Sequence, residues 1–150
     1  MSEQKTCKQR VRGELRSRIS DLEKLWKAYK EDPDKEVEDL GTFDEYGLGF
    51  DYVAPDAFGD GKAKTRKQRR EHDFRGYFRY QLSYGGPSDE FRFYCDENLN
   101  PVEIEYWFLD WFDGAHIDLT GENYKLLEEI FLDLKETGTV QHKLDASREK

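Results

Sequence analysis

Apolar residues near the start of the chain recur every three or four positions, which is the spacing of one face of an α-helix. This stripe consists of Val11, Leu15, Ile19, Leu22, Trp26 and Tyr29. Lysine and arginine residues occupy the other faces. The spacing predicts a helix from about residue 4 to residue 31, because the residue before Pro33 is disfavoured in the α region.

Over residues 74–113, apolar and polar side chains alternate, as in strands with one buried face. Turn residues at 85–88 and 96–101 divide this segment, so it predicts a three-stranded antiparallel meander. If Leu82 pairs with Phe93, and Phe93 with Ile104, Arg92 lies opposite Glu105 on a solvated face. The same register gathers an apolar face of Tyr80, Leu82, Tyr84, Phe91, Phe93, Cys95, Val102, Ile104 and Tyr106.

Weaker patterns flank the meander. Alternation over residues 46–52, with glycines inside it, predicts an edge strand. Bulky and acidic residues beyond Phe108 indicate a bulge or a strand that leaves the sheet. Helical spacing returns over residues 120–138, and the polar residues 140–150 are expected to form a frayed tail.

The 150 residues therefore predict a single α+β domain. We expect an antiparallel sheet of three to four strands, with an N-terminal and a C-terminal helix packed on one face. Aromatic residues make up 15% of the chain, and their rings can supply the buried area that a thin aliphatic content cannot. This content excludes wholesale disorder.

The sequence lacks the long apolar runs of membrane spans and signal peptides, so a cytoplasmic protein without membrane contact is expected. Cys7 and Cys95 lie far apart and outside any CxxC pair, which favours free thiols over a disulfide framework or a zinc site.

Charge is arranged in blocks along the chain. Net values are +4 for residues 1–31, −9 for 32–60, +6 for 61–83 and −10 for 84–150, giving −9 in total. Blocks this polarised create local potentials that attract partners of opposite sign. The basic block includes a predicted mobile loop over residues 54–73, whose candidate nucleic-acid-binding residues are Lys62, Lys64, Arg66, Lys67, Arg69 and Arg70.

No motif in the sequence specifies a reaction. His72, His116 and His142 lack metal-ligand spacing, and no phosphate-binding glycine loop is present. The sequence therefore predicts no catalytic residue, no cofactor and no histidine metal site. Carboxylates in residues 89–118 leave open a metal-dependent enzyme.

The segment YWFLDWFDG, residues 106–114, concentrates aromatic rings beside carboxylates. Regular strand alternation cannot bury all of these rings, so some of them are expected at the surface. Exposed rings flanked by acids are typical of sites that bind a basic protein. The alternative is that Trp107 and Trp111 cover the open end of a small core. The predicted partner-binding patch comprises Glu103, Glu105, Trp107, Asp110, Trp111 and Asp113.

The stretch FRGYFRYQLSYGGPSDEFRFY, followed by IEYWFLDWFDGA, resembles segments of small uncharacterised proteins carried by plasmids and phages. The resemblance covers about 40 residues. It implies an accessory role in conflict between mobile elements and hosts, such as inhibition of a restriction or CRISPR effector. The resulting hypothesis is a non-enzymatic acidic protein that inhibits or regulates a basic, nucleic-acid-handling protein. Direct nucleic-acid binding through residues 62–70 is the alternative.

Overall fold

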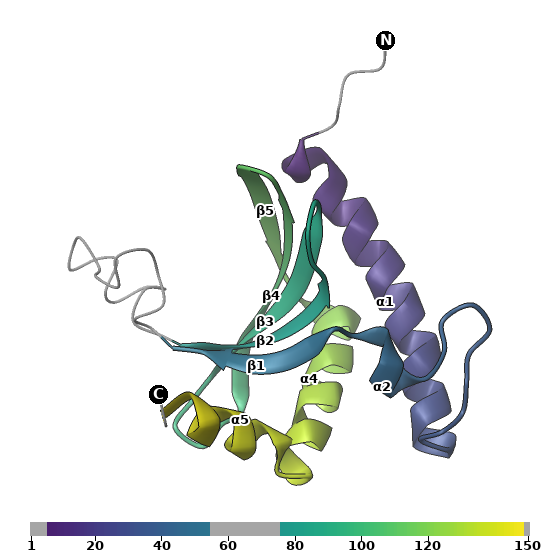
Figure 1. The fold of residues 1–150 in the computed structure, drawn as a ribbon, viewed down its shortest axis with the longest axis vertical. Coiled ribbons are helices and arrows are strands. Elements are labelled where there is room, and N and C mark those ends of the chain that lie inside the picture. Colours follow the sequence, from purple (N-terminus) through teal and green to yellow (C-terminus); the bar gives the residue numbers. More distant parts are fainter. Residues whose placement is uncertain (1–5, 55–75, 149–150) are drawn as a thin grey trace.

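A five-stranded antiparallel sheet forms the centre of the molecule, and helices pack against one of its faces (Figure 1). The computed structural model describes residues 6–54 and 76–148. The strands lie side by side in chain order: β1 (Gly49–Val53), β2 (Tyr77–Ser83), β3 (Ser88–Cys95), β4 (Pro101–Asp110) and β5 (Asp113–Asp118). The helices are α1 (Cys7–Glu31), α2 (Phe43–Tyr46), α4 (Gly121–Glu136) and α5 (Thr139–Arg148). The predicted α+β class is confirmed, with one or two more strands than expected.

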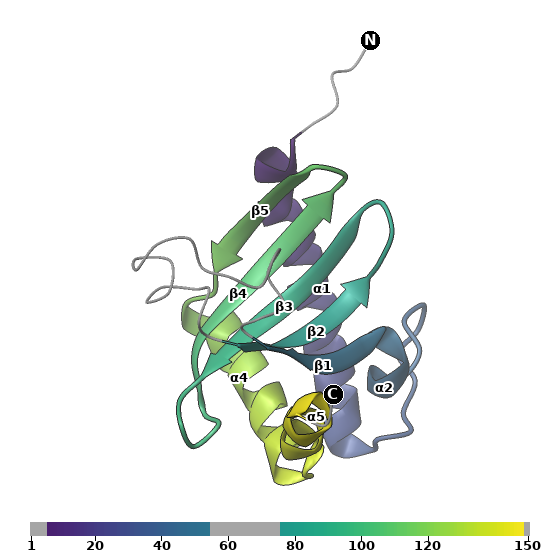
Figure 2. The ribbon, with the colours of Figure 1, turned by 60° about the vertical axis from the view of Figure 1, so that its left-hand side comes forward.

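A capping box marks the start of helix α1, and a nearby proline marks its end. Its start is a capping box, in which the Gln9 N–H donates to Thr6 Oγ1 (3.2 Å) and the Thr6 N–H donates to Gln9 Oε1 (2.8 Å). Its end is at Asp32, beside the predicted proline stop. The apolar stripe packs on β4 and β5, and Figure 2 shows α1 passing behind the strands.

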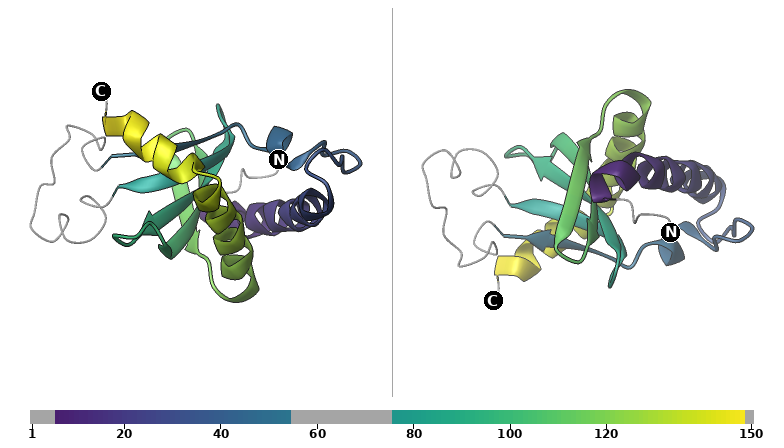
Figure 3. Two further views of the ribbon diagram at one scale, coloured as in Figure 1. Left: turned by 90° about the horizontal axis from the view of Figure 1, so that it is seen from below. Right: turned by 90° about the horizontal axis from the view of Figure 1, so that it is seen from above.

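The C-terminal residues form a helix that the sequence did not indicate. Helix α5 packs on β1 and on α4, and the two helices meet at an angle below the sheet (Figure 3). Val140 and Leu144 of α5 are buried, so the expected frayed tail over residues 140–150 is replaced by helix as far as Arg148. Val140 and Leu144 are the only large apolar side chains among its ten residues, which is too weak a periodicity to identify this helix. None of the helices within 6–54 and 76–148 combines the length and apolarity needed to cross a bilayer.

The register between β2 and β3 differs from the predicted one. Phe93 pairs with Phe78 instead of Leu82, whereas the predicted pairing of Phe93 with Ile104 is confirmed. The turn between β2 and β3 is tighter than expected, so Asp89 and Glu90 lie inside β3. A shift of four residues preserves the alternation of faces, and therefore Arg92 still lies opposite Glu105.

Two members of the predicted apolar face are exposed. Tyr84 lies in the β2–β3 turn. Val102 lies near the start of β4, where the register shifts between the Tyr94–Glu103 and Cys95–Pro101 pairs, so it does not pair with Cys95 as predicted. The remaining members are buried, apart from the partly buried Cys95.

The edges of the sheet also depart from the prediction. The chain does not leave the sheet after Phe108, because β5 turns back and pairs along β4. Position 46 belongs to the short helix α2, whose Thr42 cap accepts from the Glu45 N–H. Edge strand β1 therefore begins only at Gly49.

Candidate functional site

The predicted partner-binding patch divides into two groups. Glu103, Glu105 and Trp107 alternate along β4 on the sheet face opposite the helices. Asp110 and Asp113 end the two strands of the β4–β5 hairpin, and Trp111 lies in its turn. The alternation of β4 ends at this turn, so the six residues do not form one surface.

Two adjacent aromatic residues at the β4–β5 turn are exposed. Trp111 has a backbone φ of +57° and a side chain that is 86% exposed, and Phe112 beside it is fully exposed. A positive φ is unfavourable for a bulky residue, so the turn carries backbone strain while it directs these rings into solvent. We call Trp111 and Phe112 the aromatic tip. The alternative that Trp111 covers the core is wrong.

The neighbouring β2–β3 turn extends this exposed surface. Trp111, Leu109, Ser88 and the glycines of the β2–β3 turn line a shallow cavity of about 440 Å³. Tyr84, in the same turn, is also exposed. Exposed apolar rings beside a shallow depression are typical of protein-binding sites.

The two carboxylates beside the aromatic tip have partners within the chain. Asp113 Oδ2 accepts from the Cys7 N–H (2.8 Å), and this backbone hydrogen bond holds the pKa of Asp113 below its usual range. Asp110 Oδ2 lies 3.3 Å from Nη1 of Arg10, whose guanidinium also lies over the Phe108 ring (4.6 Å). Both acids therefore fasten the N-terminus of α1 to the hairpin.

The other half of the predicted patch is a hydrogen-bonded network on the outer sheet face. Glu105, only 1% exposed, accepts at Oε1 from the Tyr94 hydroxyl (3.0 Å) and from Trp107 Nε1 (2.9 Å). The Arg92 guanidinium lies 4.1 Å from the Trp107 ring centroid and 4.8 Å from that of Tyr77. The outer face was expected to be solvated, but an ion pair with Arg92 allows Glu90 to be buried, and hydrogen bonds allow Glu105 to be buried.

A possible metal-ligand set lies beside this network. Ligand atoms of Glu105, His116 and Asp118 all fall within 4.8 Å of one another, and the His116 ring stacks on Trp107 (4.5 Å). Mixed imidazole and carboxylate ligands suit zinc or manganese. The grouping of His116 with these two carboxylates was not predicted, because the sequence did not indicate β5, whose pairing puts Asp118 opposite Glu105. The alternation in GAHID, after the turn, was the available signal.

The most highly connected carboxylate, Asp89, lies on the helix-covered face. Arg18 of α1 donates to both of its oxygens (2.7 and 2.9 Å), and the Tyr106 hydroxyl donates to Oδ2 (2.6 Å). Ser83 Oγ also donates to Asp89. This ion pair joins α1 to β3 in the interior.

Nucleophilic chemistry gains no support from the cysteines. Both are free thiols, as the sequence predicts, and burial raises the pKa of Cys95 to about 12. The reactive thiolate of Cys95 is therefore scarce near neutral pH.

The alternative nucleic-acid-binding residues, 62–70, lie outside the described residues. Comparison with known proteins gives no match among family models, curated proteins or solved structures.

Proposed function

We propose that the protein binds another protein through the aromatic tip. The observation that carries the proposal is the exposure of Trp111 and Phe112, two large aromatic residues that are adjacent in sequence. Tryptophan and other aromatic residues dominate the binding energy of protein interfaces, because their rings bury a large area when a partner covers them.

The charge of the molecule supports a basic partner. The chain contains 24 lysine and arginine residues against 33 aspartate and glutamate residues, a net charge of −9. Such a field speeds association with a positively charged surface and repels nucleic acid. Proteins that handle nucleic acids present basic surfaces of this kind. An inhibitor or regulator of such a protein is the role we propose.

The test compares capture of partner proteins, from a lysate of the source cells, by the native chain and by a W111S/F112S variant. The native chain should retain a specific protein whose capture weakens as salt concentration rises. Serine at both positions should abolish this capture. The matched control is Val102→Ser, which removes an exposed apolar side chain elsewhere on β4. Equal capture by the native chain and the double variant would refute the proposal.

Substitution at the tip is preferable to charge reversal of Asp110 and Asp113. Because both carboxylates hold α1 in place, reversing them would disturb the fold as well as a partner surface.

Divalent-cation binding is a second candidate function, favoured by the grouping of Glu105, His116 and Asp118. Zn²⁺ or Mn²⁺ should then raise the melting temperature of the native chain. The increase should disappear in His116→Ala and persist in His142→Ala, a histidine on α5. A metal-induced shift of equal size in both variants would contradict this candidate.

A further inference from the structure

Trp107 contacts two of the three residues in the possible metal-ligand set on the outer sheet face. Its Nε1 donates to Glu105 Oε1 (2.9 Å), and its ring stacks on the His116 ring, with the ring centroids 4.5 Å apart. The strand register explains both contacts, because His116 pairs with Trp107 across β4 and β5, and Glu105 lies two residues before Trp107 on the same strand face. One side chain therefore orients a carboxylate and an imidazole together.

The second oxygen of Glu105 points toward the other members of the set. Glu105 is 1% exposed, and its Oε1 accepts from both Trp107 and the Tyr94 hydroxyl. No described residue donates a hydrogen bond to its Oε2. His116 Nε2 lies 3.7 Å from Oε2, which is beyond hydrogen-bond distance. A buried carboxylate thus keeps one oxygen without a donor, which is unfavourable unless a cation binds there.

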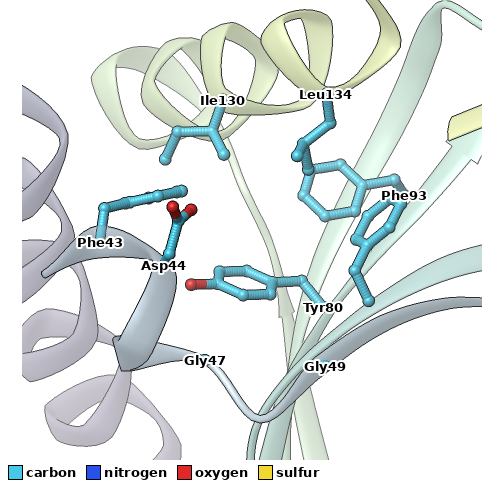
Figure 4. Close-up of a pocket in the computed structure, with 9 residues that line it drawn as sticks. Phe43, Asp44, Gly47, Gly49, Tyr80, Phe93, Ile130 and Leu134 are labelled. Carbon is cyan, nitrogen blue, oxygen red and sulfur yellow. The ribbon is translucent and has the colours of Figure 1, made fainter. Parts of the chain in front are cut away.

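An ion can reach this oxygen from the solvent. Among the described residues, the Tyr80 hydroxyl, near α2 and α4 (Figure 4), is the one buried side-chain oxygen or nitrogen that lacks both a partner and accessible surface. Glu105 Oε2 lacks a donor but is not inaccessible in this way, so it retains accessible surface. The side chains of His116 and Asp118 are 42% and 63% exposed, so the set opens to solvent on the outer face.

The spacing of the ligand atoms suits one metal ion. His116 Nε2 lies 3.7 Å from Glu105 Oε2 and 3.9 Å from Asp118 Oδ1, and the ligand atoms all lie within 4.8 Å of one another. Two ligands of a tetrahedral zinc ion, with bonds of about 2.0–2.2 Å, are about 3.4 Å apart. Rotation of the exposed Asp118 side chain closes most of this difference.

The types of ligand favour zinc over other divalent cations. Magnesium and calcium prefer sites made of oxygen ligands alone, whereas zinc binds imidazole well. Manganese stands at the weak end of the affinity series for such ligands. Two carboxylates balance the charge of the ion. Three protein ligands leave a fourth position open to solvent, as in zinc sites that hold a water molecule.

We propose that Trp107 positions Glu105 and His116 so that, with Asp118, they bind a zinc ion. This proposal rests on the second candidate function, divalent-cation binding. The hydrogen bond to Oε1 turns Oε2 toward His116, and ring stacking holds the imidazole with Nε2 near both carboxylates. Residues that orient metal ligands in this way typically contribute about 10–100-fold to metal affinity.

Isothermal titration calorimetry of the native chain with Zn²⁺, Mn²⁺ and Mg²⁺ tests the identity of the ion. Zinc should bind at least about tenfold more tightly than manganese, and more tightly still than magnesium. His116→Ala should abolish zinc binding. Equal or tighter binding of manganese would overturn the assignment to zinc. No zinc binding by the native chain would refute both the candidate function and the proposal.

Two variants test the role of Trp107. Trp107→Phe keeps a ring that stacks on His116 but lacks the N–H donor, so it should weaken zinc binding by about tenfold. Trp107→Leu lacks both contacts and should weaken it by about 100-fold. The matched control is Val102→Ser, at an exposed position of β4, which should leave zinc affinity unchanged. Thermal melting without metal verifies that each variant is folded.

Cobalt binding separates positioning from a merely structural role. Co²⁺ replaces zinc in such sites, and its visible absorption bands report the geometry of its ligands. Both Trp107 variants should alter these bands, whereas Val102→Ser should not. Native zinc affinity and a native cobalt spectrum in both Trp107 variants, with binding still lost in His116→Ala, would overturn the role of Trp107 and leave the candidate function standing.

Discussion

Tyr80 and Tyr106 occupy the same cross-strand row of the buried sheet face, on either side of Phe91, yet their hydroxyl groups meet different surroundings. The Tyr106 hydroxyl donates to Asp89 (2.6 Å), which also binds Arg18 of α1. The Tyr80 hydroxyl is buried and lacks a hydrogen-bond partner among the described residues. The same type of side chain is therefore hydrogen-bonded at one position and unpaired at the other.

This difference separates a hydroxyl group that stabilises the fold from one that does not. Around Asp89, buried donors and acceptors satisfy one another, so the cluster has little capacity for a further molecule. Around Tyr80, the hydroxyl is buried without a partner, so its oxygen makes no favourable contribution to stability. The comparison predicts large stability effects near Asp89 and small ones near Tyr80.

Asp89→Ala is expected to produce the largest effect. The substitution leaves the partly buried Arg18 without its carboxylate partner, which should reduce the free energy of unfolding by about 3–5 kcal/mol. Urea denaturation measures this loss. The control is Asp51→Ala, which removes the more exposed partner of Arg79 and should cost less than about 1 kcal/mol. Similar losses in both variants would show that Asp89 is not a special point of attachment for α1.

Alkaline pH is expected to have the next largest effect. Burial raises the pKa of both Tyr80 and Tyr106, and hydrogen bonding to Asp89 raises the latter further. The unfolded chain loses these protons near pH 10, whereas the folded chain retains them. Their contribution is thus complete below pH 10 and is lost above it, at about 1.4 kcal/mol per pH unit for each phenol.

Urea denaturation at pH 9, 10 and 11 checks this dependence. Tyr106→Phe should reduce the slope of the free energy of unfolding against pH by the contribution of one phenol. A slope that is identical in native protein and Tyr106→Phe would contradict the assignment.

The sequence predicted those features that depend on local periodicity. The α1 stripe and the alternation of β2–β4 identified the buried faces, even though the β2–β3 register was displaced, because a shift of four residues keeps each side chain on its face. Strand β5 was not predicted, because only Ala115 and Ile117 form its apolar side. Without β5, the sequence could not predict that His116 lies close to Glu105.

The candidate sites depended on non-local contacts, so they were predicted less completely. Aromatic composition indicated surface rings in residues 106–114, and Trp111 and Phe112 are indeed exposed. The internal partners of Asp110 and Asp113 come from α1, about 100 residues away, and alternation along β4 carries no information on them. The Tyr80 hydroxyl is likewise unpaired because neighbouring elements, among them α2 and α4, provide no hydrogen-bond partner for it.

Removal of one oxygen from each tyrosine gives the smallest and most direct comparison. Tyr106→Phe should lower the free energy of unfolding by about 1–3 kcal/mol, since Asp89 loses a buried donor. Tyr80→Phe removes a hydroxyl that has no partner, so it should leave stability unchanged or raise it by up to about 1 kcal/mol. Urea denaturation at pH 7 distinguishes these opposite signs. If Tyr80→Phe destabilised the protein as much as Tyr106→Phe, the Tyr80 hydroxyl would have a structural partner, and the contrast between the two tyrosines would be refuted.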